Sequence, residues 1–261
     1  MSPRTMKGLW APTLVLALTA VACGGGSSEP AAPAADAAAA APAATVDPAT
    51  AATITGTIKF DGTAPAPQAI KMNADPICAK QGAGAMSETL VVGAEGGLAN
   101  VLVYLKEGVT GSFPAPTTPV VLDQKGCKYT PHVFGIQVGQ PLQVVNSDPT
   151  LHNIHAIPKT NSEFNTGQPI QGMKFDHTFT ASEVMVPFKC DVHGWMNAQA
   201  AVLDHPFFAV SGADGKFEIK GLAPGKYTIE AHHEKLGTQT ATIEVAASES
   251  KASDFSFKAA S

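Results

Sequence analysis

The chain has 261 residues, of which 15% are charged, and its formal net charge is −5. This length is too great for one small domain and accommodates two folded units with a tail. Because an acidic chain has no excess of positive charge to hold a phosphate backbone, nucleic acid is excluded as an expected partner. Short runs rich in Gly, Pro, Thr and Val favour strands over long helices, so the predicted fold class is all-β.

Residues 1–22 have the pattern of an export signal peptide. Arg4 and Lys7 form a positive start, and the apolar stretch that follows is too short for a comfortable membrane span. Ala20-Val21-Ala22-Cys23 resembles the bacterial lipobox, with Ala20 in place of the usual Leu. The resemblance implies a lipoprotein in which Cys23 carries the lipid. Loss of the signal removes Arg4 and Lys7 and no acid, so the net charge changes from −5 to −7.

The expected location is the periplasmic side of the cell envelope, with the lipid as the membrane anchor. Gly24 stands where an Asp would signal retention at the inner membrane, which favours the outer membrane. Cleavage near the same position without lipidation is the alternative, and it predicts a soluble periplasmic or secreted protein.

Residues 23–52 are rich in Ala and Pro and almost free of charge. Prolines interrupt the alanine runs at Pro30, Pro33, Pro42 and Pro48. Since proline breaks helices, this segment is predicted to be a semi-extended tether rather than a continuous helix.

The rest of the chain shows apolar residues with the period of two that is typical of strands. The pattern is clear at Ile54, Ile58 and Phe60, and again in the strands predicted near the C-terminus. The stretch from Asp214 to Tyr227 resembles the carboxypeptidase regulatory-like (prealbumin-like) sandwich, with Gly215 and Gly225 expected at tight turns with positive φ.

The opening strands of that family resemble residues 56–62 and 99–105, more than a hundred residues before its closing strands. The resemblance implies one prealbumin-like sandwich made of residues 53–112 and 206–259, with a second domain, residues 113–205, inserted in it. Two tandem domains are the alternative.

Of the four cysteines, Cys78 and Cys127 are the pair left after the lipid site and the metal site described next. An even remainder in an exported chain favours a disulfide, with two separate buried thiols as the alternative.

Potential metal ligands are concentrated in two predicted loops. Cys190, His193 and Met196 lie on one short loop after an apolar strand, and His152 lies on an earlier loop. One thiolate, two imidazoles and a weak thioether match blue copper and no common zinc site. The methionine favours copper.

These motifs, Cys-x2-His-x2-Met and an upstream His-Asn-x-His, resemble the cupredoxins, blue copper proteins of the amicyanin and plastocyanin type. Gly139, Pro141 and Ser147-Asp148 add to the likeness. The resemblance implies a Greek-key β-sandwich that binds one copper ion through His152, Cys190, His193 and Met196. It also implies that Asn153 clamps the ligand loop by hydrogen bonds. His193 is expected to present an exposed edge through which electrons cross, with Trp195 and Val192 forming a small docking patch.

The other histidines are expected to be structural. His155 is the main alternative to His152, and we expect it on the same face of the strand, one step beyond the rim. His132, His177 and His205 have no partner at ligand spacing, and His232-His233 is expected at a solvated edge.

The implied function is transfer of single electrons to or from a redox protein of the cytochrome or oxidase type, without enzymatic activity. A copper chaperone or scavenger is the first alternative, and it predicts a solvent-open site with exchangeable metal. An envelope-binding lipoprotein with a structural metal is the second.

Overall fold

The computed structural model describes residues 46–259, in which almost all regular structure is β-strand, so the predicted all-β class is confirmed. The signal predicted for residues 1–22, the lipid site Cys23 and most of the tether lie outside the described residues. Within the described part of the chain, no helix is long and apolar enough to cross a membrane.

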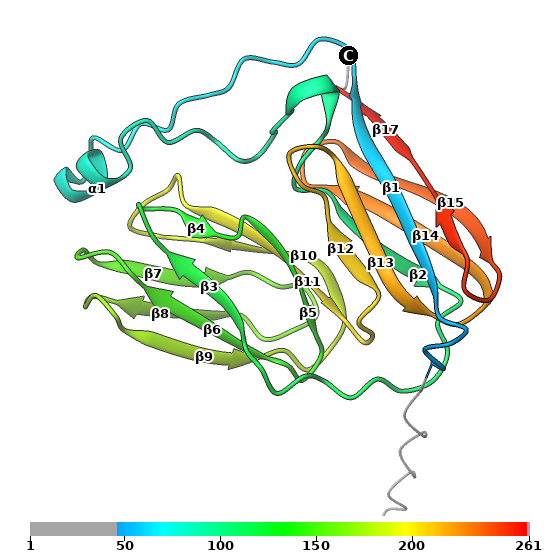
Figure 1. The fold of residues 1–261 in the computed structure, drawn as a ribbon. Coiled ribbons are helices and arrows are strands. Elements are labelled where there is room, and N and C mark those ends of the chain that lie inside the picture. Colours follow the sequence, from blue (N-terminus) through cyan, green and yellow to red (C-terminus); the bar gives the residue numbers. More distant parts are fainter. Residues whose placement is uncertain (1–45, 260–261) are drawn as a thin grey trace, which may run out of the picture. The chain divides into compact units, whose positions relative to one another are not determined.

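Residues 120–203 form a two-sheet structure that we call the central sandwich (Figure 1). One sheet has the strand order β5-β11-β10-β7-β8 and the other β4-β3-β6-β9, with β5 parallel to β11 and β3 parallel to β6. The strands are β3 (Val120–Gln124), β4 (Tyr129–Thr130), β5 (Val133–Gln137), β6 (Pro141–Asn146), β7 (His152–Ala156), β8 (Phe164–Gln168), β9 (Lys174–Thr178), β10 (Glu183–Lys189) and β11 (Asn197–Leu203). Alternate residues of β6 are buried, as expected for a strand with one face on a core.

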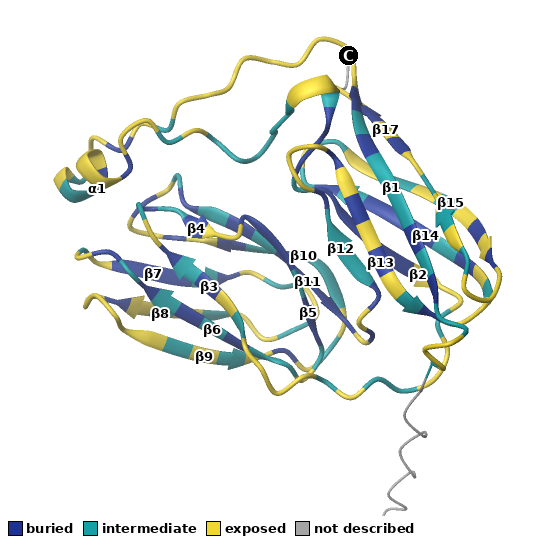
Figure 2. Ribbon diagram, viewed as in Figure 1, coloured by how far each residue is buried: buried dark blue, intermediate teal, exposed yellow. Residues whose placement is uncertain are grey.

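The remaining strands form a second two-sheet structure, which we call the split sandwich because its strands lie on both sides of residues 120–203 in the chain. They are β1 (Ala52–Asp61), β2 (Leu102–Glu107), β12 (Phe208–Val210), β13 (Lys216–Leu222), β14 (Gly225–His233), β15 (Gly237–Val245), β16 (Ser250–Ala252) and β17 (Phe255–Lys258). In one sheet β1 lies between β13 and β16 and also pairs with β17, and the other has the order β12-β2-β14-β15. Buried and exposed residues alternate along β13, which places one face of this sheet on the core (Figure 2).

The turn before β13 explains one glycine of the predicted hairpin. Gly215 has φ +76°, and a Cβ there would lie 2.2 Å from the carbonyl oxygen of Ile58, so both the conformation and the space require glycine. The expectation of a positive φ at Gly225 was wrong, because Gly221 has positive φ (79°) and Gly225 does not.

The segment between β1 and β2 carries a short helix, α1 (Pro76–Gln81), and a 3-10 turn, η1 (Ala94–Gly96). Asp75 caps the N-terminus of α1, because its side chain accepts the backbone N–H groups of Ile77 and Cys78, and Pro76 has no N–H to satisfy. Met72 and Cys78 are buried in the same apolar cluster as the core of the central sandwich. The helix is therefore packed on the central sandwich, although its chain position lies between two strands of the split sandwich.

Cys78 and Cys127 form a disulfide, as predicted, with an S–S distance of 2.02 Å and a Cα–Cα distance of 5.5 Å. Cys78 lies in α1, and Cys127 lies in the loop between β3 and β4. The bond therefore ties α1 to the central sandwich.

The two sandwiches share a third buried cluster that includes Leu102 and Tyr104 of β2 and Ala201 and Leu203 of β11. His132 of the central sandwich also forms an ion pair with Glu234, which follows β14 of the split sandwich. Burial alone would lower the pKa of His132, but the hydrogen bond to Glu234 and its charge outweigh this effect and raise the pKa.

His233, expected at a solvated edge, is instead fully buried, whereas His232 is half-buried. Nδ1 of His233 accepts the backbone N–H groups of Lys235 and Leu236, and its Nε2 has no hydrogen-bond partner among the described residues. The alternation of a strand placed the two side chains on opposite faces but gave no information about what covers each face.

Burial of His233 predicts a loss of stability in mild acid. Desolvation lowers the pKa of this imidazole from 6.5 to about 4, so between these values the unfolded chain binds more protons than the folded chain. The free energy of unfolding should therefore fall as the pH drops from about 7 to about 5, by roughly 2 kcal/mol from this group. Urea unfolding of the wild type and of His233→Asn at the two pH values measures the difference. An equal pH dependence in both proteins would contradict the assignment.

Candidate metal centre

Three potential metal ligands meet at one end of the central sandwich. His152 is the first residue of β7, Cys190 follows β10, and His193 lies three residues further along the loop to β11. Their ligand atoms lie within 4.8 Å of one another. The two Nδ1 atoms are 2.9 Å apart, and Sγ of Cys190 lies 4.0 Å from Nδ1 of His193. The exposed fractions are only 0%, 1% and 2%, so the donors face one another in a buried position.

Met196, the predicted axial ligand, closes the same loop. Its N–H donates to the carbonyl oxygen of His193, and its own carbonyl oxygen accepts the N–H of Cys190. The side chain is 1% exposed and belongs to the same buried cluster as Cys190. Met196 is thus part of the buried end of the sandwich, and its role as a ligand stays a prediction.

The orientation of both imidazoles is fixed by carboxylates on the side opposite the ligand atoms. Nε2 of His152 lies 3.0 Å from Oδ2 of Asp148, and Nε2 of His193 lies 3.2 Å from Oδ2 of Asp75. A ring nitrogen that donates its hydrogen to a carboxylate leaves the other nitrogen free to bind a metal. Burial lowers the pKa of His152 and so favours the neutral ring that metal binding requires.

Asp148 is itself held by the loop that contains Cys127. Its two carboxylate oxygens accept the backbone N–H groups of Gly126 and Cys127 at 2.9 and 2.8 Å. Sequence reasoning noted Asp148 only as part of a motif and missed Asp75 altogether. The Asp75-Pro76 pair is a signal for the start of a helix, but it does not indicate a contact with a residue 118 positions away.

The thiol and its loop are clamped by Asn153, the second residue of β7. Oδ1 of Asn153 accepts the backbone N–H of Asp191 at 2.7 Å and lies 3.2 Å from Sγ of Cys190. The N–H of His193 points at the same sulfur, at 3.3 Å. These are the contacts that the predicted clamping role of Asn153 requires. The N–H of His193 is a donor that can stabilise a thiolate, whereas Oδ1 of Asn153 accepts the hydrogen of the thiol and positions the loop.

The expectation that His193 presents an exposed edge was wrong, because this side chain is buried. Asp75 and the disulfide cover Nε2, with Sγ of Cys78 at 3.8 Å. Both sulfur atoms of Cys78 and Cys127 are joined in the disulfide and do not offer a thiolate. The physical reason for the difference is the additional helix α1, which the disulfide holds over the end of the sandwich.

Trp195 also differs from the exposed patch that was expected. Its indole N–H donates to the carbonyl oxygen of Cys127 at 3.0 Å, and its ring centroid lies 4.9 Å from that of His193. The side chain is half-buried and supports the loop, whereas Val192 is 49% exposed as expected.

His155 is not a rival ligand, and its predicted position was wrong. It lies three residues after His152, so the alternation of a strand turns it to the opposite face. There its ring nitrogens bond Asp191 at 2.9 Å and Glu163 at 2.7 Å.

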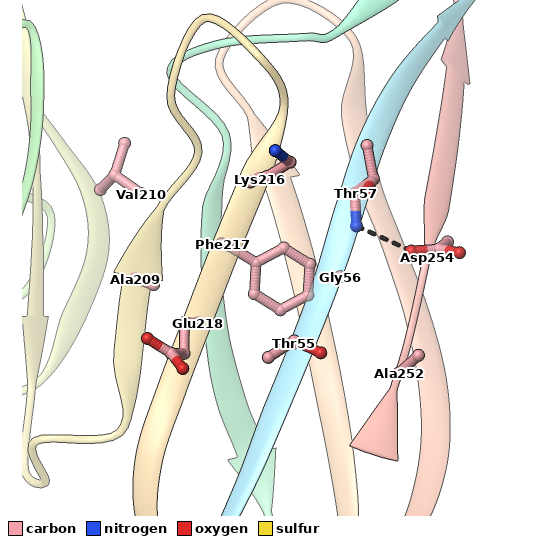
Figure 3. Close-up of a pocket in the computed structure, with 10 residues that line it drawn as sticks. All are labelled: Thr55, Gly56, Thr57, Ala209, Val210, Lys216, Phe217, Glu218, Ala252 and Asp254. Atoms are coloured by element: carbon pink, nitrogen blue, oxygen red, sulfur yellow. Dashed lines mark hydrogen bonds between the residues drawn. The ribbon is translucent and has the colours of Figure 1, made fainter. Parts of the chain in front are cut away.

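A hollow of about 670 Å³ lies elsewhere, on the split sandwich (Figure 3). Threonines and glycine of β1 line it together with Phe217 and Lys216 of β13, and the N–H of Thr57 donates to Asp254 at 2.7 Å. No potential metal cluster of residues 46–259 borders it. We therefore place the functional site at the buried donors and not at this hollow.

No protein-family model matches the sequence, and no curated protein matches it. Among solved structures, a copper-containing nitrite reductase from Thermus scotoductus SA-01 is 22% identical, with a TM-score of 0.32, over 39% of this chain and 25% of its own. A purple cupredoxin from Nitrosopumilus maritimus is 28% identical, with a TM-score of 0.26, over 29% of this chain and 81% of its own. An oxidised amicyanin variant is 22% identical, with a TM-score of 0.29, over 32% of this chain and 81% of its own. At these TM-scores the interpretation of the site rests on the geometry of its own residues.

Proposed function

We propose that residues 113–205 are a cupredoxin-like domain in which His152, Cys190, His193 and Met196 would hold one copper ion. We further propose that the chain transfers single electrons in the cell envelope. The observation that supports this proposal is that two Nδ1 atoms and one thiol converge in a buried position. The Nε2 atom of each imidazole lies within hydrogen-bond distance of a carboxylate.

The chemistry of the donors fits copper better than zinc. A structural zinc site has four strong ligands, whereas this end of the sandwich offers one thiol, two imidazoles and a buried thioether. Copper, when bound, supplies one-electron chemistry between its +2 and +1 states. The carboxylates and Asn153 hold the imidazoles and the sulfur in place, so the donor groups need to move little between the two states.

Burial of the ligands favours electron transfer over delivery of the ion. A chaperone must present its metal to an acceptor, but all four proposed ligands are 0–2% exposed. Neither a substrate nor an acceptor protein can reach these atoms without moving α1. Transfer of electrons through the protein needs no such access.

The proposed partner is a redox protein of the cytochrome or oxidase type, met at the membrane to which a lipid on Cys23 would anchor the chain. Val192 and Leu151 are 49% and 42% exposed and flank the ligand positions in the chain, so they provide apolar surface for a small, transient contact.

Copper loading of the mature chain tests the proposal. The protein lacking residues 1–22 is mixed with Cu(II), and visible absorption and electron paramagnetic resonance are recorded. We expect an intense thiolate-to-copper band and reversible reduction in voltammetry. A colourless, metal-free or zinc-only protein would rule the proposal out.

A further inference from the structure

Asp75 is the one carboxylate at this site that comes from outside the central sandwich, among the described residues. It lies between β1 and β2 of the split sandwich in the chain, yet its Oδ2 is 3.2 Å from Nε2 of His193, a residue 118 positions away. The side chain of Asp75 is 20% exposed and that of His193 is 3% exposed. The contact is therefore at the boundary of the buried site, between solvent and the imidazole.

The carboxylate of Asp75 is held from several directions. Oδ1 accepts the N–H groups of Ile77 and Cys78 at 2.7 and 3.0 Å, and Oδ2 accepts the hydroxyl of Thr150 at 3.0 Å. These hydrogen bonds fix the carboxylate beside His193.

The disulfide lies between the two carboxylates that orient the imidazoles. Cys78 is three residues after Asp75, which holds His193. Its partner Cys127 donates its N–H to Asp148, which holds His152. One covalent bond therefore links the segment that carries Asp75 to the loop that holds Asp148, and so helps to keep both carboxylates against the two rings.

Packing leaves little room for α1 to shift. A Cβ on Gly82, at the end of the helix, would lie 2.2 Å from the sulfur of Met72 and 2.9 Å from the carbonyl oxygen of Gly126. Because Gly126 precedes Cys127, the end of the helix rests on the loop that supports Asp148. The position of Asp75 is thus set by packing, by the disulfide and by its own hydrogen bonds.

We propose that Asp75 is a positioning residue for the copper site, supplied by the segment between β1 and β2. It fixes the ring of His193 through Nε2, shields the edge of that ring and places a negative charge beside the metal. This inference rests on the proposed copper function. Because a nearby negative charge stabilises the more positive ion, Asp75 favours Cu(II) over Cu(I) and lowers the reduction potential.

The variant Asp75→Asn separates this role from the role as a helix cap. Asparagine also caps helices well, so α1 and the disulfide should persist, while the negative charge and the acceptor for Nε2 are lost. We expect Cu(II) affinity to fall about 10–100-fold, Cu(I) affinity to fall less, and the reduction potential to rise. Asp75→Glu should restore part of both properties. Asp61→Asn, the same change of charge on the split sandwich, should change neither.

The measurements are competition with a chelator for each oxidation state, voltammetry, and a thiol count that reports the disulfide, all on the mature chain. If Asp75→Asn fails to fold, Asp75→Ser offers another helix cap and also removes the charge, and the potential should still rise. Wild-type protein that forms no thiolate–copper band would refute the proposed function. A normal wild-type band together with unchanged affinity and potential in the folded variants would refute the role of Asp75 alone.

Discussion

A serine in place of Cys190 is expected to abolish the thiolate-to-copper absorption of the copper-loaded chain. The thiolate is the soft, electron-rich ligand of the proposed set, and a hydroxyl stays protonated at neutral pH and binds copper weakly. The fold should survive, because a serine hydroxyl can replace both hydrogen bonds of the sulfur, those with Asn153 and with the N–H of His193. We expect the free energy of unfolding without metal to change by about 1 kcal/mol.

A matched control for this variant is His155→Ala, which removes a histidine three residues from His152 on the opposite face of β7. Visible absorption of the two copper-loaded variants, beside the wild type, makes the comparison. Loss of the band in Cys190→Ser with retention in His155→Ala supports the assignment. Retention in Cys190→Ser, or loss in His155→Ala, would assign the metal to different residues.

Removing the disulfide should have the largest effect on stability. The double variant Cys78→Ser/Cys127→Ser frees a loop with a sequence separation of 49 residues. The chain-entropy model for a loop of that size gives a loss of about 4 kcal/mol in the free energy of unfolding. Urea unfolding under non-reducing conditions measures it.

The same double variant should release copper faster. α1 covers His193, so the metal leaves only when this segment opens, and each 1.4 kcal/mol by which opening becomes easier corresponds to about tenfold in the opening equilibrium. Transfer of copper to an excess of chelator gives the rate, with Ala79→Ser on the exposed side of α1 as the control. A release rate equal to that of the wild type would show that α1 does not limit access.

Part of the candidate site was predictable because three of its proposed ligands are close in sequence. Cys190, His193 and Met196 occupy one loop, and His152 begins β7 after another loop, so the residue types and their spacing indicate the proposed ligand set. The disulfide was also predictable, because an even number of cysteines remained for an exported chain.

The surroundings of His193 could not be predicted, because they depend on contacts between distant segments. Asp75 and Cys78 meet His193 across more than a hundred residues, and no local pattern reports that distance. His233 shows the same limit, since its burial depends on how neighbouring elements pack. Local periodicity predicts which way a side chain points, and tertiary packing decides what covers it.

X-ray absorption at the copper edge of the loaded mature chain is the most direct test of the central claim. We expect one short copper–sulfur bond and two copper–nitrogen bonds to imidazole, with the short copper–sulfur contribution lost in Cys190→Ser. A copper ion surrounded only by nitrogen and oxygen, or by several thiolates, would contradict it.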